Sequence, residues 1–162
     1  MTTSLDLNVS MPELTRTLLD IYSVSGEEKT IADAVYEALS AYPHLRDGDA
    51  MIARTDFGPR NGGERTRILL AGHLDTVPLP TVAGSLGTVP ARIVEDNGDW
   101  ILYGRGATDM KGGVAVQLKL AAELGEHDTD YNLTYVFYDH EEVASELSGM
   151  ARLIRNHGEL LT

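Results

Sequence analysis

Three short segments of the chain hold side chains whose types and spacing could do chemistry. These side chains are one imidazole and four carboxylates: His73, Asp75, Asp109, Glu141 and Glu142. Imidazole and carboxylate groups bind zinc in proteins, and the chain has no cysteine that could supply a thiolate. A carboxylate that is free of metal can accept a proton from water and pass it to a leaving group. Any metal site in this chain must therefore be built from these residue types.

The first segment follows an apolar run from Ile68 to Ala71, which predicts a buried central strand. His73 and Asp75 come where this strand leaves the sheet, and strand ends in open α/β sheets are where sites are built. Residues two apart in an extended chain point to the same side, so Asp75 can accept the second N–H of the His73 ring, as a metal-bound imidazole requires. The alternative is a structural hydrogen-bonded pair, because His-x-Asp is a short and common pattern.

The second segment, residues 103–113, is a glycine-rich loop that carries Asp109. Its glycines permit a tight backbone path, and the apolar residues between Val114 and Leu124 predict a helix directly after it. Gly104-x-Gly106 could belong to a dinucleotide-binding loop, but the full pattern G-x-G-x-x-G fails because position 109 is Asp. The loop is therefore interpreted as a holder for Asp109 at the start of a helix.

The third segment runs from Asp139 to Glu142 and follows residues 133–138, a β-branched and aromatic stretch that predicts another central strand. An acidic pair such as Glu141-Glu142 is usually a solvated charged surface. Here three successive loops beside regular elements all carry carboxylates, and solvation alone would require a coincidence. We therefore expect the three segments to form one site.

The remaining elements must form the framework that positions these segments. A capping box of Ser10 and Glu13 predicts a helix from Met11 to Ile21. A second helix should open on Glu27 and end before Pro43, and an alternating strand should run from Met51 to Thr55. A long loop from Leu79 to Pro90 should lead to a hairpin of Arg92–Val94 and Trp100–Tyr103 around Asn97-Gly98. A last helix should run from Gly149 to Asn156, with Met150, Leu153 and Ile154 facing inward.

Composition limits the partners that the chain can have. Its 162 residues are 43% hydrophobic and 23% charged, which indicates one globular domain. A net charge of −12 argues against binding to nucleic acid or to an anionic membrane surface. No segment approaches the ~18 apolar residues that span a bilayer, and the first residues lack the features of a signal peptide. We therefore expect a cytoplasmic protein.

Together the three segments closely resemble the M20-type metallopeptidases, a family of dinuclear zinc amidohydrolases. The matching motifs are Ala-Gly-His-Leu-Asp-Thr-Val-Pro at residues 71–78, Tyr-Gly-Arg-Gly-Ala-Thr-Asp-Met-Lys-Gly-Gly at residues 103–113, and Glu-Glu at residues 141–142. The resemblance covers nearly the whole chain from about Glu13. It implies a three-layer α/β/α fold with a mixed central sheet, helices on both faces and the site at the strand ends.

The resemblance also implies a role for each site residue. His73 would bind one zinc ion, Glu142 would bind the other, and Asp109 would bridge the two. Co²⁺ could replace zinc in such a site. Asp75 would orient His73, and Glu141 would be the general base.

The family pattern is incomplete in these 162 residues. Each zinc would have two ligands here, whereas the family adds one acidic residue and one distant histidine, which we expect beyond Thr162. Candidates inside the chain are weak by their sequence context: His44, His127, His140, His157 and Glu159. Residues 1–162 are thus expected to be the N-terminal portion of the catalytic domain, without the inserted dimerisation domain and the C-terminal part. This portion should be inactive alone, and the full-length protein should be a homodimer.

Within the family, the run from Glu141 to Leu153 is most similar to actinobacterial succinyl-diaminopimelate desuccinylases. That similarity implies hydrolysis of the small molecule N-succinyl-LL-2,6-diaminopimelate to succinate and LL-2,6-diaminopimelate, in lysine biosynthesis. One alternative is another activity of the family, such as that of an acetylornithine deacetylase, an aminoacylase or a dipeptidase. A second alternative is a non-catalytic module that keeps the fold without the reaction.

Overall fold

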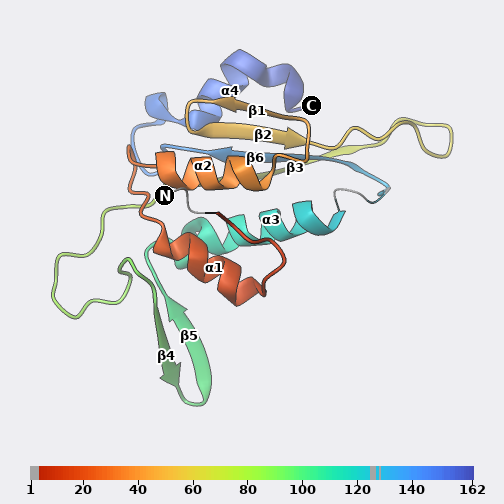
Figure 1. Cartoon of the computed structure of the whole chain (residues 1–162). Helices are drawn as coiled ribbons and strands as arrows, with labels where there is room; N and C mark the ends of the chain where they lie inside the picture. Colours follow the sequence, from red (N-terminus) through yellow and green to blue (C-terminus); the bar gives the residue numbers. More distant parts are fainter. Residues whose placement is uncertain (1–3, 125–126, 128) are drawn as a thin grey trace.

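The computed structural model describes residues 4–124, 127 and 129–162 (Figure 1). The helices are α1 (Met11–Asp20), α2 (Lys29–Ala38), α3 (Gly112–Leu124) and α4 (Gly149–His157). The strands are β1 (His44–Asp47), β2 (Ala50–Arg54), β3 (Arg67–His73), β4 (Arg92–Asp96), β5 (Asp99–Tyr103) and β6 (Asn132–Tyr138). Within the described ranges no helix has the length and apolar character needed to cross a membrane. The expectation about a signal peptide partly concerns residues 1–3, which lie outside the described residues.

Four strands form one mixed sheet in the order β1-β2-β6-β3. The central strand, β6, is parallel to β3 and antiparallel to β2. Helices α1, α2 and α3 lie on one face of this sheet, and α4 lies on the other (Figure 1). This arrangement confirms the expected three-layer α/β/α fold.

Buried side chains on both faces of β6 hold the layers together. Tyr135 and Phe137 belong to the larger core, which α1, α2 and α3 share with the sheet. Val136 faces the other way and packs in a smaller core with Ile52 and Leu153. Successive residues of a strand point to opposite faces, so a strand covered on both sides is a continuous apolar run. Burial of one such large side chain stabilises the fold by ~1.5–3 kcal/mol.

The first two helices follow the sequence patterns closely. The backbone N–H of Ser10 donates to Glu13 Oε2 at 3.0 Å, which confirms the predicted capping box, and α1 buries Leu14 and Leu18 completely. Helix α2 begins at Lys29, two residues later than expected. Glu28 is the residue directly before the helix, and its buried side chain accepts a hydrogen bond from a backbone N–H in the loop after β6.

Several details of burial differ from the predictions. Strand β3 lies at the edge of the sheet rather than at its centre, and Ile68 and Leu69 are 38% and 39% exposed, because among the described residues only β6 pairs with it. Strand β2 is buried on both faces instead of alternating. Ile154 is 56% exposed because α4 packs on the sheet through Met150 and Leu153. Strand β1 was not predicted, since its four residues are mostly polar.

The hairpin of β4 and β5 forms a separate two-stranded sheet that extends away from the main body (Figure 1). Asn97 and Gly98 at its tip have φ angles of 52° and 91°. A two-residue hairpin turn of this kind needs positive φ at both positions, which explains why Asn-Gly predicted it correctly. The segment from Leu79 to Pro90 contains no helix or strand, as expected for a loop.

Candidate metal centre

The parallel pairing of β3 and β6 determines where the site residues emerge. His73, the last residue of β3, lies opposite Tyr138, the last residue of β6. Because the two strands run in the same direction, the residues that follow them leave the sheet at one edge. Asp75 and the run 139–142 therefore lie side by side, although more than 60 residues separate them in the sequence.

Asp109 reaches the same edge from the turn that precedes α3. Gly106 in this turn has a φ angle of 81°, and a Cβ atom on it would lie 2.6 Å from Cγ2 of Thr76. Glycine therefore allows the turn to approach the residues after β3 at this distance. Lys111 is buried under the turn, and its Nζ donates to the backbone oxygen of Ile21 at 2.6 Å. The turn is thus fixed between the end of α1 and the end of β3.

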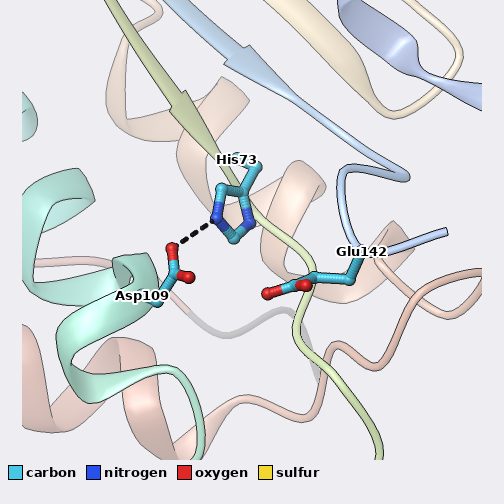
Figure 2. A group of neighbouring side chains, drawn as sticks. All are labelled: His73, Asp109 and Glu142. Carbon is cyan, nitrogen blue, oxygen red and sulfur yellow. Dashed lines mark hydrogen bonds and ion pairs between the residues drawn. The ribbon is translucent and has the colours of Figure 1, made fainter. Parts of the chain in front are cut away.

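His73, Asp109 and Glu142 come together at this edge from three separate elements (Figure 2). One ligand atom from each side chain lies within 4.8 Å of the others. The closest pair is His73 Nε2 and Asp109 Oδ1, at 2.9 Å. His73 is buried and Asp109 is exposed, so the group opens to solvent on its carboxylate side. One imidazole nitrogen and two carboxylates are a donor set that fits zinc.

Asp75 lies fully buried beside this group and is not one of its members. Its carboxylate accepts hydrogen bonds from the backbone N–H groups of Glu141 and Glu142, both at 3.0 Å, and from Ser25 Oγ at 2.6 Å. Nδ1 of His73 lies 3.0 Å from the backbone oxygen of Asp75 and 3.4 Å from its Oδ1. Asp75 therefore contacts the His73 ring mainly through the main chain, while its carboxylate holds the loop after β6.

Ser25 is a contact that the sequence did not reveal. It lies in the connection between α1 and α2, which carries none of the three motifs. Nothing local indicates that its hydroxyl donates to a carboxylate 50 residues further along the chain. The backbone confirms the same connection, since the N–H of Ser25 donates to the oxygen of Thr76 at 3.2 Å.

Burial and hydrogen bonds determine the protonation of this pair. Burial opposes the positive charge of His73, but contacts with Asp75 and Asp109 raise its pKa to about 9. Burial likewise opposes the negative charge of Asp75, yet hydrogen bonds from His73, Ser25 and the Glu141 and Glu142 backbone hold its pKa well below the usual value. In the metal-free protein His73 is therefore protonated near neutral pH, and a metal ion must displace that proton.

Glu141 leaves the same strand end as Glu142 but lies outside the group of three. Its side chain is exposed and lies near Tyr138. Burial raises the pKa of Tyr138 to about 12, and the negative charge of Glu141 adds to this effect. The two neighbouring glutamates thus occupy different environments, with Glu142 in the group and Glu141 beside it.

The weak candidate ligands are all outside this group in the described part of the chain: His44, His127, His140, His157 and Glu159. Nδ1 of His140 lies 2.7 Å from Asp139 Oδ2, and Nε2 of His157 lies 3.3 Å from Asp47 Oδ2. Both rings are therefore held by carboxylates that take no part in the group.

A cavity of about 580 Å³ adjoins the three residues. It is lined by residues 101–109 together with Thr76, Val77, Gly87 and Glu142. Two members of the group, Asp109 and Glu142, thus form part of its wall. A volume of this size is typical of sites for small molecules.

Comparison with known proteins agrees with this geometry. The model of peptidase family M20/M25/M40 matches residues 69–161. A Mycobacterium tuberculosis protein provisionally named succinyl-diaminopimelate desuccinylase is 46% identical over 155 residues, which are 93% of this chain and 39% of that protein. The succinyl-diaminopimelate desuccinylase of Corynebacterium glutamicum is 38% identical over 154 residues, which are 91% of this chain and 38% of that enzyme. The chain therefore spans about two fifths of the length of these relatives.

Solved structures share the fold at lower identity. A tripeptidase from Staphylococcus aureus superimposes with a TM-score of 0.69 at 21% identity, covering 94% of this chain and 40% of that one. Human carnosine dipeptidase 1 superimposes with a TM-score of 0.69 at 19% identity, covering 92% of this chain and 35% of that one. At these identities the likeness concerns the fold alone.

Proposed function

Because the chain belongs to peptidase family M20/M25/M40, we propose that it carries part of the active site of a zinc-dependent N-acyl amide hydrolase. The substrate that we propose is N-succinyl-LL-2,6-diaminopimelate, which would yield succinate and LL-2,6-diaminopimelate. The observation that carries this proposal is the group of His73, Asp109 and Glu142 at the wall of a cavity large enough for a small molecule. The names of the two bacterial relatives support the choice of substrate.

In this proposal the three grouped residues hold two zinc ions. His73 would bind one ion, Glu142 would bind the other, and Asp109 would bind both. When bound, zinc would polarise the amide carbonyl and lower the pKa of water. The buried His73 would fix the first position, and Asp109 lies directly beside it, with its Oδ1 2.9 Å from His73 Nε2.

Glu141 is the residue that we propose as general base. It accepts a proton from the attacking water and delivers it to the nitrogen of the leaving amine, so that the amide C–N bond breaks and the carboxylate product forms. Two features support this role. Its side chain lies outside the metal group, and its backbone N–H is held by Asp75 at 3.0 Å. Asp75 itself is proposed as the residue that positions His73 and this loop.

We also propose that residues 1–162 are the N-terminal portion of the catalytic domain. The relatives are more than twice as long as the matched segment, and each zinc ion in our assignment has only two ligands from this chain. The missing acidic and histidine ligands, and the parts that form a homodimer, would then come from residues outside this chain. The isolated 162 residues should accordingly bind zinc weakly and show no turnover.

An assay of the full-length protein on a panel of acyl amino acids tests the proposal. With zinc bound, we expect hydrolysis of N-succinyl-diaminopimelate at a kcat/KM at least tenfold above that for N-acetylornithine, N-acetylmethionine and a simple dipeptide. Removal of zinc by a chelator should abolish the activity, and added zinc should restore it. Preference for the dipeptide would indicate a peptidase, and no hydrolysis of any member of the panel would contradict the proposal.

A further inference from the structure

Arg105 is a cation that has no partner in the described part of the chain. Its Nε atom is buried and makes no hydrogen bond, and its guanidinium forms no ion pair. The side chain itself is only partly exposed. A buried donor without an acceptor destabilises the fold, and a half-buried charge without a counter-charge does so further. Such a group calls for an explanation in a native protein.

Other partly buried arginines of this chain form ion pairs with carboxylates. Arg46 forms ion pairs with Asp33 and Asp49, both at 2.7 Å. Arg152 contacts a buried carboxylate at 2.6 Å, and Arg54 contacts an exposed carboxylate at 2.9 Å. In a chain with 25 acidic and 13 basic residues, carboxylates are abundant, so the isolation of Arg105 does not reflect a shortage of partners.

The backbone around Arg105 fixes its position. It stands between two glycines, and both lie against neighbouring segments. A Cβ atom on Gly104 would be 2.9 Å from Cδ1 of Leu19, and one on Gly106 would be 2.6 Å from Cγ2 of Thr76. The loop is therefore held closely between α1 and the residues after β3. A side chain on a fixed backbone loses less freedom when it binds a ligand.

Arg105 lines the same cavity as the metal group. The charged residues of the wall are Arg105, Asp109 and Glu142. In the proposed function the two carboxylates are occupied by zinc, which leaves Arg105 as the charged group that faces a ligand. A guanidinium presents a planar fork of N–H donors, and this fork matches the two oxygens of a carboxylate.

We infer that Arg105 binds a carboxylate of the substrate and thereby places the amide bond beside the metal group. The inference rests on the proposed function and adds a specificity residue to it. The ligand class is an N-acyl amino acid with a free carboxylate. That carboxylate could belong to the acyl group, as in a succinyl chain, or to the amine part of the molecule, and both have the same chemistry towards Arg105.

Kinetics of the zinc-loaded full-length protein test this assignment. We expect Arg105→Gln to raise KM for N-succinyl-diaminopimelate about 10- to 100-fold, as for loss of a charge-assisted hydrogen bond, with kcat changed less than threefold. If the acyl carboxylate is the one bound, N-acetyl-diaminopimelate should show no change in KM. If a carboxylate of the amine part is bound, both substrates should lose affinity equally.

The matched control is Arg92→Gln. Arg92 is an exposed arginine in β4, outside the cavity, and its loss changes the net charge by the same amount. It should leave both KM values unchanged, so an equal effect of both variants would assign the result to the overall charge and overturn the inference. Arg105→Lys keeps the charge without the fork and should give an intermediate KM. It also carries the test if Arg105→Gln does not fold.

Calorimetric titration with succinate provides a readout that needs no turnover. Wild-type protein and Arg92→Gln should bind succinate equally, Arg105→Lys at least threefold more weakly, and Arg105→Gln at least tenfold more weakly. Succinamide, which lacks charge, should not distinguish the variants. Binding that depends on Arg105 without any hydrolysis would refute the proposed function and keep this inference. Hydrolysis with unchanged KM and succinate affinity in both Arg105 variants would refute the inference alone.

Discussion

Carboxylates at the two ends of the four-stranded sheet have different neighbours. Where β3 and β6 begin, Asp56 lies between Arg54, at 2.9 Å, and Arg67, which also contacts it. Where the same strands end, Asp109 and Glu142 lie within one group with His73. In the described residues no arginine or lysine forms an ion pair with either of these two carboxylates.

This difference teaches that the same charge can be structural or functional according to its neighbours. At the first end, burial opposes the charge of Asp56, but the Arg54 and Arg67 guanidinium groups hold its pKa below the usual value, so the pairing favours the folded state. At the second end, the only cation in the group of three is the protonated His73 ring, so two carboxylates share one positive charge. The excess negative charge there is what gives the group its affinity for a metal ion.

The prediction with the largest expected effect separates metal binding from catalysis at the end of the sheet that carries Glu141 and Glu142. In the full-length protein, Glu141→Gln should lower kcat about 100-fold or more with zinc content near wild type, because it removes the base and no ligand. Glu142→Gln should lose zinc, because it removes a carboxylate from the group. Steady-state kinetics and metal analysis of both variants measure this. Full activity in Glu141→Gln, or zinc loss in both variants, would show that the two roles are wrongly assigned.

The protonation of His73 should make the zinc affinity depend on pH by a factor of similar size. Its pKa of about 9 means that zinc must displace a proton throughout the neutral range. Apparent zinc affinity should therefore rise about tenfold per pH unit, or about 100-fold from pH 6 to pH 8. Titration of metal-free protein with buffered zinc at pH 6, 7 and 8 measures the slope. An affinity that stops rising above pH 7 would show that His73 titrates normally.

Protonation affects the stability of the fold in opposite directions at the two ends of the sheet. The raised pKa of His73 contributes stability to the metal-free protein below the unfolded value of 6.5, and this contribution disappears as pH rises through about 9. The lowered pKa of Asp56 contributes stability above the unfolded value of 3.8, and this contribution disappears as pH falls through its lower folded value. Asp56→Asn should therefore reduce the loss of stability in acid and leave the slope of zinc affinity unchanged.

Replacement of Asp75 by Asn should weaken zinc binding about 10- to 100-fold without abolishing the fold. The reason is that Asp75 touches the His73 ring and anchors the backbone of both glutamates. Ser25→Ala should have a smaller effect, since the two backbone donors to Asp75 remain. Zinc affinity measured by competition with a chelator distinguishes the variants. Asp56→Asn is the matched control at the other end, and a loss of affinity there would contradict the separation of the two ends.

The smallest expected effect is on thermal stability in the presence of a chelator. Glu142→Gln should change the melting temperature by less than about 2 °C, because it removes both the repulsion from Asp109 and the attraction to protonated His73, and these two effects oppose one another. Asp56→Asn should lower it by about 2–4 °C at most, because Asp56 is half-exposed and its ion pairs are screened. Calorimetry of both variants at low and moderate salt measures these shifts. A fall of more than about 2 °C in both would mean that the carboxylates at the two ends are equally structural.

Much of the fold followed from local patterns. The capping box of Ser10 and Glu13, the Asn97-Gly98 turn and the apolar run of β6 each depend on residues close together in sequence, and each was predicted correctly. Local patterns failed where burial depends on distant segments. Ile68 and Leu69 are as apolar as the residues of β6, yet they are partly exposed because their strand has a neighbour on one side only.

By itself the sequence determined which residue types are available for chemistry and which elements carry them. His73, Asp109 and Glu142 could be named as candidates because each follows or precedes a recognisable element and because no cysteine competes for a metal. Only the tertiary structure decided their distances and partners. The hydrogen bond from Ser25 to Asp75, and the absence of a partner for Arg105 Nε among the described residues, are visible only in the packed structure. Packing brings together residues that are 50 or more positions apart, and such a contact cannot be predicted from the residues on either side of one position.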